Sequence, residues 1–428
     1  MPMSDQFKKR LDPMLPEIAD HFGTPFHIYD EAGIFDTGER LKRAFSGIDN
    51  FREYFAVKAL PNPSILKIIQ KMGFGFDCSS IPELQLCRHI GARGEDILFS
   101  SNNTTPAEFS AALADGGCIL NLDDISLVPK VPDFPEMISF RYNPGEKRTG
   151  NTIIGIPAEA KYGVAHDQLI PAYAKAMERG AKRFGIHAMM ASNELAHSYM
   201  VDTAQMLLNA AARIGNALKI RFESINIGGG FGIPYTPDDQ PLDLETMATE
   251  MIGRFASFRE QNDYIPTLAM ESGRYMTGPH GVLVTRVINR KEIYRTHIGV
   301  DASMSALMRP GIYGAYHHIT KQGEDMDTAT QIVDVVGSLC ENNDKFAVQR
   351  TLPVLNENDL IYIHDTGAHG HAMGFTYNGR LRPKELLLGV DGSVELIRRE
   401  ETAEDYFSTL RYTPDVLLTD ADRCSLAN

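Results

Sequence analysis

A chain of 428 residues is too long for one ordinary core, so the sequence predicts two domains unless part of it forms a barrel of about 250 residues. The composition is that of an average globular protein, and the formal net charge of -14 argues against nucleic acid as a partner. No run approaches the roughly 20 consecutive apolar residues of a membrane helix, and Met1 to Phe22 carries charges throughout. We therefore expect a cytoplasmic protein that binds neither a membrane nor nucleic acid.

Short apolar runs alternate with longer amphipathic stretches from residue 52 to residue 271, which is typical of parallel strands joined by helices. Eight such units predict an α/β fold with a closed (β/α)8 TIM barrel. The strands are expected at Tyr54–Val57, Gly75–Cys78, Ile97–Ser100, Cys118–Leu122, Ile138–Tyr142, Arg183–His187, Ser224–Ile227 and Thr267–Glu271. Helices are expected at Pro63–Lys71, Pro82–His89, Pro106–Ala114, Asp167–Arg179 and Ala204–Ile214.

After residue 281 the pattern changes to short alternating runs separated by turn residues, which favours a mostly antiparallel β domain. A further strand, Pro25–Asp30, precedes the barrel, so the N-terminus is expected to complete this second domain. We therefore predict a barrel domain over residues 31–280 and a β domain formed by residues 1–30 and 281–428. The later strands are expected at Gly281–Asn289, Gln331–Val336, Leu360–His364 and Ser393–Arg398.

The C-terminal ends of barrel strands converge on one mouth, so polar residues directly after the strands are candidates for chemistry. They are Lys58, Asp77, Ser100, Asn143, His187, Gly228 to Gly230, and Glu271 with Arg274. Lys58 at such a position can be desolvated, which lowers its pKa and favours attack on an aldehyde, although a strand-end lysine is often only a surface residue.

The glycines after the seventh strand can cradle a phosphate with their N–H groups, or simply form a flexible turn. Glu271 follows the next strand and would lie beside them. A lysine for the aldehyde, glycines for the phosphate and a carboxylate for the ring nitrogen together predict a pyridoxal 5'-phosphate site. Five cysteines without CxxC spacing argue against a disulfide framework and a zinc site, so no metal is expected.

Eight motifs in order resemble the fold-type III pyridoxal-phosphate decarboxylases, and within them the diaminopimelate decarboxylases, from about Pro25 to Arg382. They are FAVKALPNP around Lys58, RYNPG from Arg141, KYG from Lys161, INIGGGFG from Ile225, ESGR from Glu271, RPGIYGA from Arg309, VVGSLCENND from Val335 and HDTGAHGHAMGFTYN from His364. The resemblance implies an alanine racemase-like architecture, a (β/α)8 barrel followed by a β domain. It also implies a head-to-tail homodimer whose two active sites are shared between subunits.

The resemblance further implies a role for each matching residue. Lys58 would hold the cofactor covalently, Glu271 would face its pyridine nitrogen, and Arg274 would contact phosphate or substrate. The implied cofactor-binding set is Lys58, Asp77, His187, Ser192, Gly228, Gly229, Gly230, Glu271, Gly273, Arg274 and His369.

On the substrate side, Arg309 and Tyr313 match a pair that holds the distal end of the substrate, through two parallel hydrogen bonds from the guanidinium to a carboxylate. Cys340 and Glu341 match residues offered by the partner subunit, the thiol as a catalytic proton donor and the carboxylate as a contact to the distal ammonium. Arg274 and His369 complete the implied substrate-binding set. The implied reaction converts meso-diaminopimelate to L-lysine and carbon dioxide.

The chain departs from the family pattern at several positions near the implied site. Met189 stands where the family has a histidine that stacks on the cofactor, Asn342 and Asn343 replace Ser-Gly, and His369 replaces a tyrosine. His369 and His187 therefore have two interpretations, a ligand contact or a hydrogen-bonded structural histidine. The departures leave open a decarboxylase of D- or L-lysine, of ornithine or of a specialised precursor. An amino-acid racemase and a non-catalytic cofactor-binding protein are less favoured alternatives.

Overall fold

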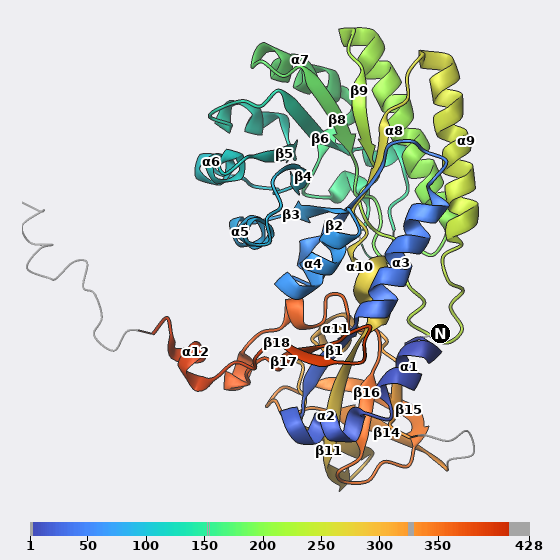
Figure 1. Ribbon diagram of the computed structural model, residues 1–428, viewed down its shortest axis with the longest axis vertical. Helices are drawn as coiled ribbons and strands as arrows, with labels where there is room; N and C mark the ends of the chain where they lie inside the picture. Colours follow the sequence, from blue (N-terminus) through green and yellow to red (C-terminus); the bar gives the residue numbers. More distant parts are fainter. Residues whose placement is uncertain (1–2, 152, 154, 324–328, 411–428) are drawn as a thin grey trace, which may run out of the picture.

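The computed structural model describes residues 3–151, 153, 155–323 and 329–410, and it confirms the predicted barrel. Eight parallel strands form one sheet, which closes where the first strand pairs with the last (Figure 1). The strands are β2 (Phe51–Ala56), β3 (Gly75–Cys78), β4 (Gly94–Phe99), β5 (Cys118–Leu122), β6 (Met137–Asn143), β8 (Arg183–His187), β9 (Phe222–Asn226) and β10 (Thr267–Met270). A short strand, β7 (Val164–Ala165), pairs with the C-terminal end of β6.

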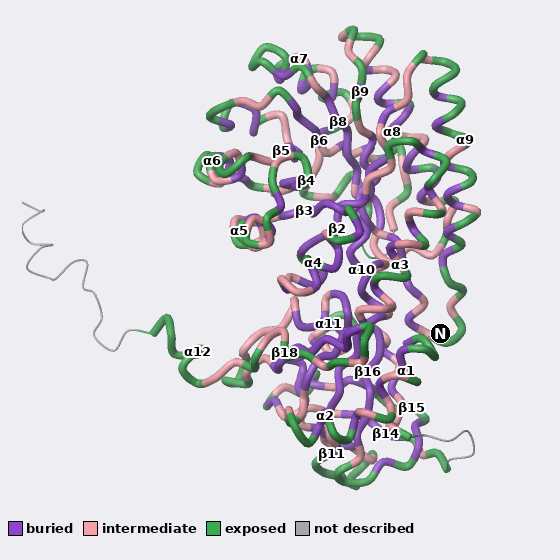
Figure 2. Tube along the Cα trace, in the orientation of Figure 1, coloured by how far each residue is buried: buried purple, intermediate pink, exposed green. Residues whose placement is uncertain are grey.

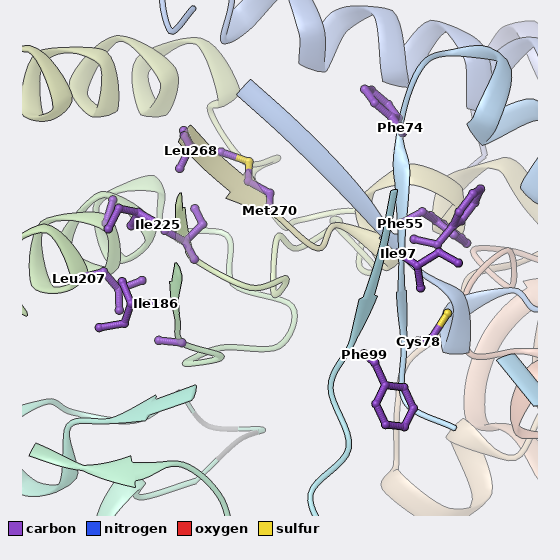
Figure 3. Packing of buried hydrophobic residues seen from close by; sticks show 14 of the residues in the cluster. Phe55, Phe74, Cys78, Ile97, Phe99, Ile186, Leu207, Ile225, Leu268 and Met270 are labelled. Atoms are coloured by element: carbon purple, nitrogen blue, oxygen red, sulfur yellow. The ribbon is translucent and has the colours of Figure 1, made fainter. Parts of the chain in front are cut away.

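Alternate residues of each barrel strand point outward and pack under the surrounding helices, forming the largest hydrophobic cluster of the protein. Figure 3 shows Phe55, Cys78 and Ile97 in this cluster, from the three neighbouring strands β2, β3 and β4. The barrel strands are buried along most of their length, whereas the outer faces of the helices are exposed (Figure 2). The helices are α3 (Glu31–Ala44), α4 (Pro63–Lys71), α5 (Ile81–His89), α6 (Pro106–Leu113), α7 (Leu169–Glu178), α8 (His197–Leu218), α9 (Leu244–Asn262) and α10 (Gly273–Thr277).

Local capping explains why some of these helices were predictable in place and others were not. Helix α4 begins with a proline, and its N-cap Asn62 accepts a hydrogen bond from the N–H of Ser64 at 3.0 Å. The predicted helix Ala204–Ile214 is too short, because α8 begins seven residues earlier. No side chain caps its start at Ala196, so the sequence carries no start signal there.

The second sheet is mostly antiparallel, as predicted, and runs in the order β15-β14-β12-β11-β1-β17-β18, with β16 paired to β11 and β13 paired to β16. Strand β1 (Phe26–Asp30) lies between β11 and β17, which joins the N-terminal segment to the C-terminal half of the chain. The remaining strands are β11 (Gly281–Glu292), β12 (Thr296–Val300), β13 (Ile319–Lys321), β14 (Thr330–Val336), β15 (Lys345–Pro353), β16 (Leu360–Ile363), β17 (Lys384–Leu388) and β18 (Val394–Arg398).

Four short helices complete the β domain: α1 (Asp5–Leu11), α2 (Leu15–Phe22), α11 (Arg309–Tyr313) and α12 (Ala403–Phe407). Helices α1 and α2 bury Phe7, Leu11 and Leu15 in one cluster with strand β1. The two sheets lie one beyond the other along the long axis of the molecule (Figure 1). We propose the domain limits expected above, 31–280 and 1–30 with 281–428; residues 411–428, including Cys424, lie outside the described residues. Within the described residues no helix is long and apolar enough to cross a membrane.

Candidate active site

A cavity of about 790 Å³ opens at the C-terminal ends of the barrel strands, next to the β domain. It brings together ten of the candidate residues predicted above, which come from both domains. These are Lys58, Asp77, Ser100, His187, Ser192, Glu271, Arg274, Arg309, Tyr313 and His369. A smaller adjoining pocket shares Lys58, Ser192, Glu271, Arg274 and His369 and adds Gly229, Gly230 and Gly273.

Lys58 lies in a short 3-10 turn, Val57–Ala59, directly after strand β2. Its side chain is half exposed toward the cavity, and Nζ is 3.9 Å from Oδ2 of Asp77. Burial and the neighbouring Glu271 raise the pKa of Asp77 to about 8, against the pull of the Lys58 ammonium. The β domain steadies this turn, because the N–H of His369 donates to the carbonyl of Ala59 at 2.9 Å.

Glu271 follows strand β10 and is almost fully buried. Asn226 donates to its Oε1 at 2.8 Å, and Nε2 of His187 lies 3.3 Å from the same oxygen. Burial alone would raise the pKa of Glu271, but His187, Lys58 and Asn226 outweigh it and lower the pKa to about 2. Glu271 is therefore an ionised carboxylate at the floor of the cavity.

His187 is held in place by Asn121, whose Nδ2 lies 2.9 Å from its Nδ1. The amide of Asn121 donates to Nδ1, which leaves Nε2 as the ring nitrogen nearer to Glu271, 3.3 Å from its Oε1. The structure thus places His187 as a support of Glu271 from the neighbouring strands, in addition to lining the cavity.

The glycine loop after β9 has a conformation that only glycine tolerates. Gly228 and Gly230 have φ of +70° and +103°, and a Cβ on Gly229 would lie 2.4 Å from the carbonyl oxygen of Glu271. The loop is tied to the carboxylate strand by the N–H of Glu271, which donates to the carbonyl of Gly228 at 2.9 Å. Such a cradle, which a side chain would fill, fits a phosphate group.

Two arginines lie against Tyr235 at the side of the cavity. Arg274 donates to the Tyr235 hydroxyl at 2.5 Å and to Ser192 Oγ at 3.3 Å, and the Cζ of Arg309 is 4.6 Å from the tyrosine ring centre. Arg309 also donates to Nε2 of His317 at 2.8 Å. Burial and the guanidinium of Arg309 lower the pKa of His317 to about 3, so its imidazole is neutral and Nε2 accepts this hydrogen bond. Among the described residues neither arginine pairs with an Asp or Glu, so both guanidinium groups can bind anions.

Cys340 and Glu341 are not brought to the cavity of their own chain. Cys340 is exposed on the loop between β14 and β15, where its N–H donates to Oδ1 of Asn378 at 2.8 Å.

His369 lines the cavity, and burial together with Arg274 and Arg309 lowers the pKa of His369 well below its usual value, so it is neutral. Tyr313 lines the rim of the cavity and is 64% exposed.

Several side chains that matter to the site were not singled out from the sequence. Asn226 stands within INIGGGFG and Arg141 within RYNPG, so those motifs carried a signal, whereas Asn121, Tyr235 and His317 gave none. Arg141 lines the cavity with its Cζ 3.7 Å from the centre of the Tyr162 ring. Asn143, a strand-end candidate, instead donates to the carbonyls of Pro157 and Tyr162 at 2.9 Å and holds its own loop.

An amine at the mouth, a glycine cradle and an ionised, buried carboxylate fit pyridoxal phosphate, which supplies a ring that takes up an electron pair when it is bound. The comparison with known families agrees, since residues 34–278 match the model of the pyridoxal-dependent decarboxylases, pyridoxal-binding domain. The chain belongs to this family, the fold-type III pyridoxal-phosphate decarboxylases, as its motifs predicted. It is a carboxy-lyase that acts on amino acids with pyridoxal phosphate as its cofactor.

Individual relatives narrow this class further. The chain is 49% identical to Protein TabA of Pseudomonas amygdali pv. tabaci, over 97% of each chain. It is 37% identical to the diaminopimelate decarboxylase of Methanothermobacter thermautotrophicus, over 91% of this chain and 92% of the relative. The crystal structure of diaminopimelate decarboxylase from M. jannaschii superposes with a TM-score of 0.86 at 28% identity, over 93% of this chain and 94% of that one. The relatives support a decarboxylase of diamino acids.

Proposed function

We propose that this enzyme decarboxylates meso-diaminopimelate to L-lysine and carbon dioxide. The observation that carries the proposal is the buried guanidinium of Arg309, which lines the substrate cavity and pairs with no carboxylate of the described residues. Asp365 attracts this guanidinium, but no ion pair joins the two side chains. A buried charge without an ion-pair partner is costly, so a carboxylate at the distal end of the substrate is its natural partner. L-Lysine and ornithine lack this second carboxylate.

The remaining site residues have roles that follow from their positions. The amine of Lys58 would hold the cofactor covalently, and the ionised Glu271 would keep a proton on its ring nitrogen. Ser192, Arg274 and the glycine loop would hold the phosphate. Nζ of Lys58 lies 3.9 Å from Oδ2 of Asp77 at the mouth, where the two groups can exchange a proton.

We further propose a homodimer in which Cys340 and Glu341 of the partner subunit complete each site. Both residues lie outside the cavity of their own chain, and Cys340 is exposed. In this arrangement the thiol delivers a proton to the carbon that has lost its carboxylate, and Glu341 contacts the distal ammonium of the substrate. The asymmetric pair of Arg309 and Glu341 thus matches a zwitterionic distal end.

A specialised diamino acid is the second candidate. The chain is more similar to Protein TabA, whose name states no substrate, than to the diaminopimelate decarboxylases named above. It also carries Met189 and His369 in the cavity, where the family pattern has other residues. Such a substrate would keep the distal amino-acid end and differ between its two ends.

The test is carbon dioxide release by the purified holoenzyme with meso- and LL-diaminopimelate, D- and L-lysine, and L-ornithine, with Lys58→Ala as the inactive control. We expect turnover of meso-diaminopimelate at the highest kcat/KM of the panel. Preference for lysine or ornithine would contradict the role of Arg309. No turnover of any panel member by a preparation that binds the cofactor would favour the specialised substrate.

A further inference from the structure

The interior of the barrel below the active site is not filled in the usual way. Barrels of this type are normally packed with layers of bulky branched side chains. Here the inward-facing apolar residues form a cluster of only five, and a cavity of about 80 Å³ lies against all of them. The five are Tyr54, Leu98, Ile119, Met137 and Ala269.

Small polar residues make the room for this cavity. Ser139 and Ser224 line it, and both lie beside Gly185 in the strand between them. A Cβ on Gly185 would lie 2.6 Å from Ser224 Oγ and 3.3 Å from Ser139 Cβ. Hydroxyl groups and amides therefore line the cavity beside the five apolar side chains, and these polar groups can hold water molecules there.

Two amides connect the cavity with the active site above it. Asn121 and Asn226 both line the cavity, and the same side chains hold His187 and Glu271. The Oδ1 atom of Asn121 is buried and accepts no hydrogen bond from the described residues. A buried amide oxygen of this kind is normally satisfied by an ordered water.

The other end of the cavity is lined by charged side chains that reach the surface. Arg183 donates to both carboxylate oxygens of Glu223, at 2.9 and 3.0 Å from Nε, and pairs with Glu95 as well. All three side chains line the cavity, and each is more than one third exposed. The cavity thus spans the barrel from a solvated ring of charges to the amides under the active site.

We propose that this cavity is a binding site for a short column of water molecules, and that the column carries protons between the N-terminal face of the barrel and the His187–Glu271 pair. A single water needs on the order of 10–15 Å³ of such space, so several fit. When ligands occupy the mouth of the barrel, the water column still reaches His187 and Glu271 from the N-terminal face. The proposal concerns the water site and does not depend on which diamino acid is the substrate. The other titratable groups near the pair are Asp77, Glu53, Lys58, Tyr54 and Arg141 around Glu271, and Asp123 around His187.

The water site is tested by a crystal structure of the holoenzyme at a resolution that shows ordered surface waters. We expect waters within hydrogen-bond distance of Asn121 Oδ1 and the hydroxyls of Ser139 and Ser224. Ser139→Val should displace them by adding methyl groups, whereas Ser139→Ala should retain them. A cavity without ordered waters in the wild-type enzyme would overturn the site. Ala269→Val fills the same space from another strand if Ser139→Val does not fold.

The proton route is tested by a pH jump on the holoenzyme, with the absorbance of the bound cofactor followed by stopped flow. We expect the relaxation to slow at least about tenfold in the valine variant that displaces the waters, and to change less than about twofold in Ser139→Ala. The equilibrium affinity for pyridoxal phosphate should stay within about twofold of the wild-type value in the valine and alanine variants, because neither Ser139 nor Ala269 lines the active-site cavity. An unchanged relaxation in a variant without the waters would overturn the route.

Discussion

Replacing Arg309 by glutamine tests the proposed recognition of the distal carboxylate. Arg309 is only 8% exposed, and its guanidinium donates to His317 at 2.8 Å and lies 4.6 Å from the ring centre of Tyr235. Glutamine removes the charge but keeps a donor for His317. The variant should therefore fold, and the substitution should weaken binding of the substrate without disturbing the packing of the cavity wall.

The size of the effect follows from the hydrogen bonds that a carboxylate would receive. Two bonds from a guanidinium to a carboxylate are worth about 1.5–3 kcal/mol each. Burial of the guanidinium offsets part of this, so we take about 3 kcal/mol as the net loss. This free energy corresponds to a fall in kcat/KM for meso-diaminopimelate of roughly 100-fold.

The assay compares kcat/KM for meso-diaminopimelate and for L-lysine in the wild-type enzyme and in Arg309→Gln. Only the substrate with the distal carboxylate should lose the full factor. Arg350→Gln is the control for loss of a charge beside the same His317, because Arg350 donates to the His317 carbonyl but does not line the active-site cavity. An equal loss for both substrates, with cofactor affinity unchanged, would refute the assignment of Arg309 to the distal carboxylate.

Four other predictions concern single residues of the site and its support. Lys58→Ala should lose the covalent adduct that borohydride fixes between cofactor and wild-type enzyme, seen by mass spectrometry; an adduct retained by the variant would place the cofactor on another lysine. Glu271→Gln should bind the cofactor but lower kcat by about 10²–10³, the usual cost of removing one electrostatic group aimed at the reacting system, and activity near the wild-type level would contradict its role. Burial raises the pKa of Glu53 from 4.5 to about 8, so the folded apoenzyme keeps a proton that the unfolded chain releases above about pH 4.5. The free energy of unfolding should therefore fall as the pH rises from about 4.5 to about 8. Urea unfolding curves should show a smaller dependence on pH for Glu53→Gln, and an unchanged dependence would argue against a protonated Glu53. Mixing inactive Cys340→Ala with inactive Lys58→Ala should restore turnover through mixed dimers with one intact site, whereas no recovery after verified subunit exchange would contradict the shared site.

The order of elements and part of the site could be predicted from the sequence, because both depend on local patterns. The strands Gly75–Cys78, Cys118–Leu122 and Arg183–His187 lie where the apolar runs placed them. The geometry of parallel strands fixes which end of each strand carries chemistry, so the sequence alone predicts that Lys58 and Glu271 lie at the same mouth of the barrel.

Only the tertiary structure decided how the side chains from distant segments support one another. The support of Glu271 by Asn226 and by the Asn121–His187 pair joins four strands, and the contact of Arg309 with Tyr235 joins the β domain to the barrel. Such contacts depend on the closure of the barrel and on the docking of the second sheet. Periodicity along the chain indicates which face of a strand is buried, but not which side chains that face contacts. The sequence therefore determined the positions of the reactive groups along the barrel. The fold determined their charge states and the side chains that hold them.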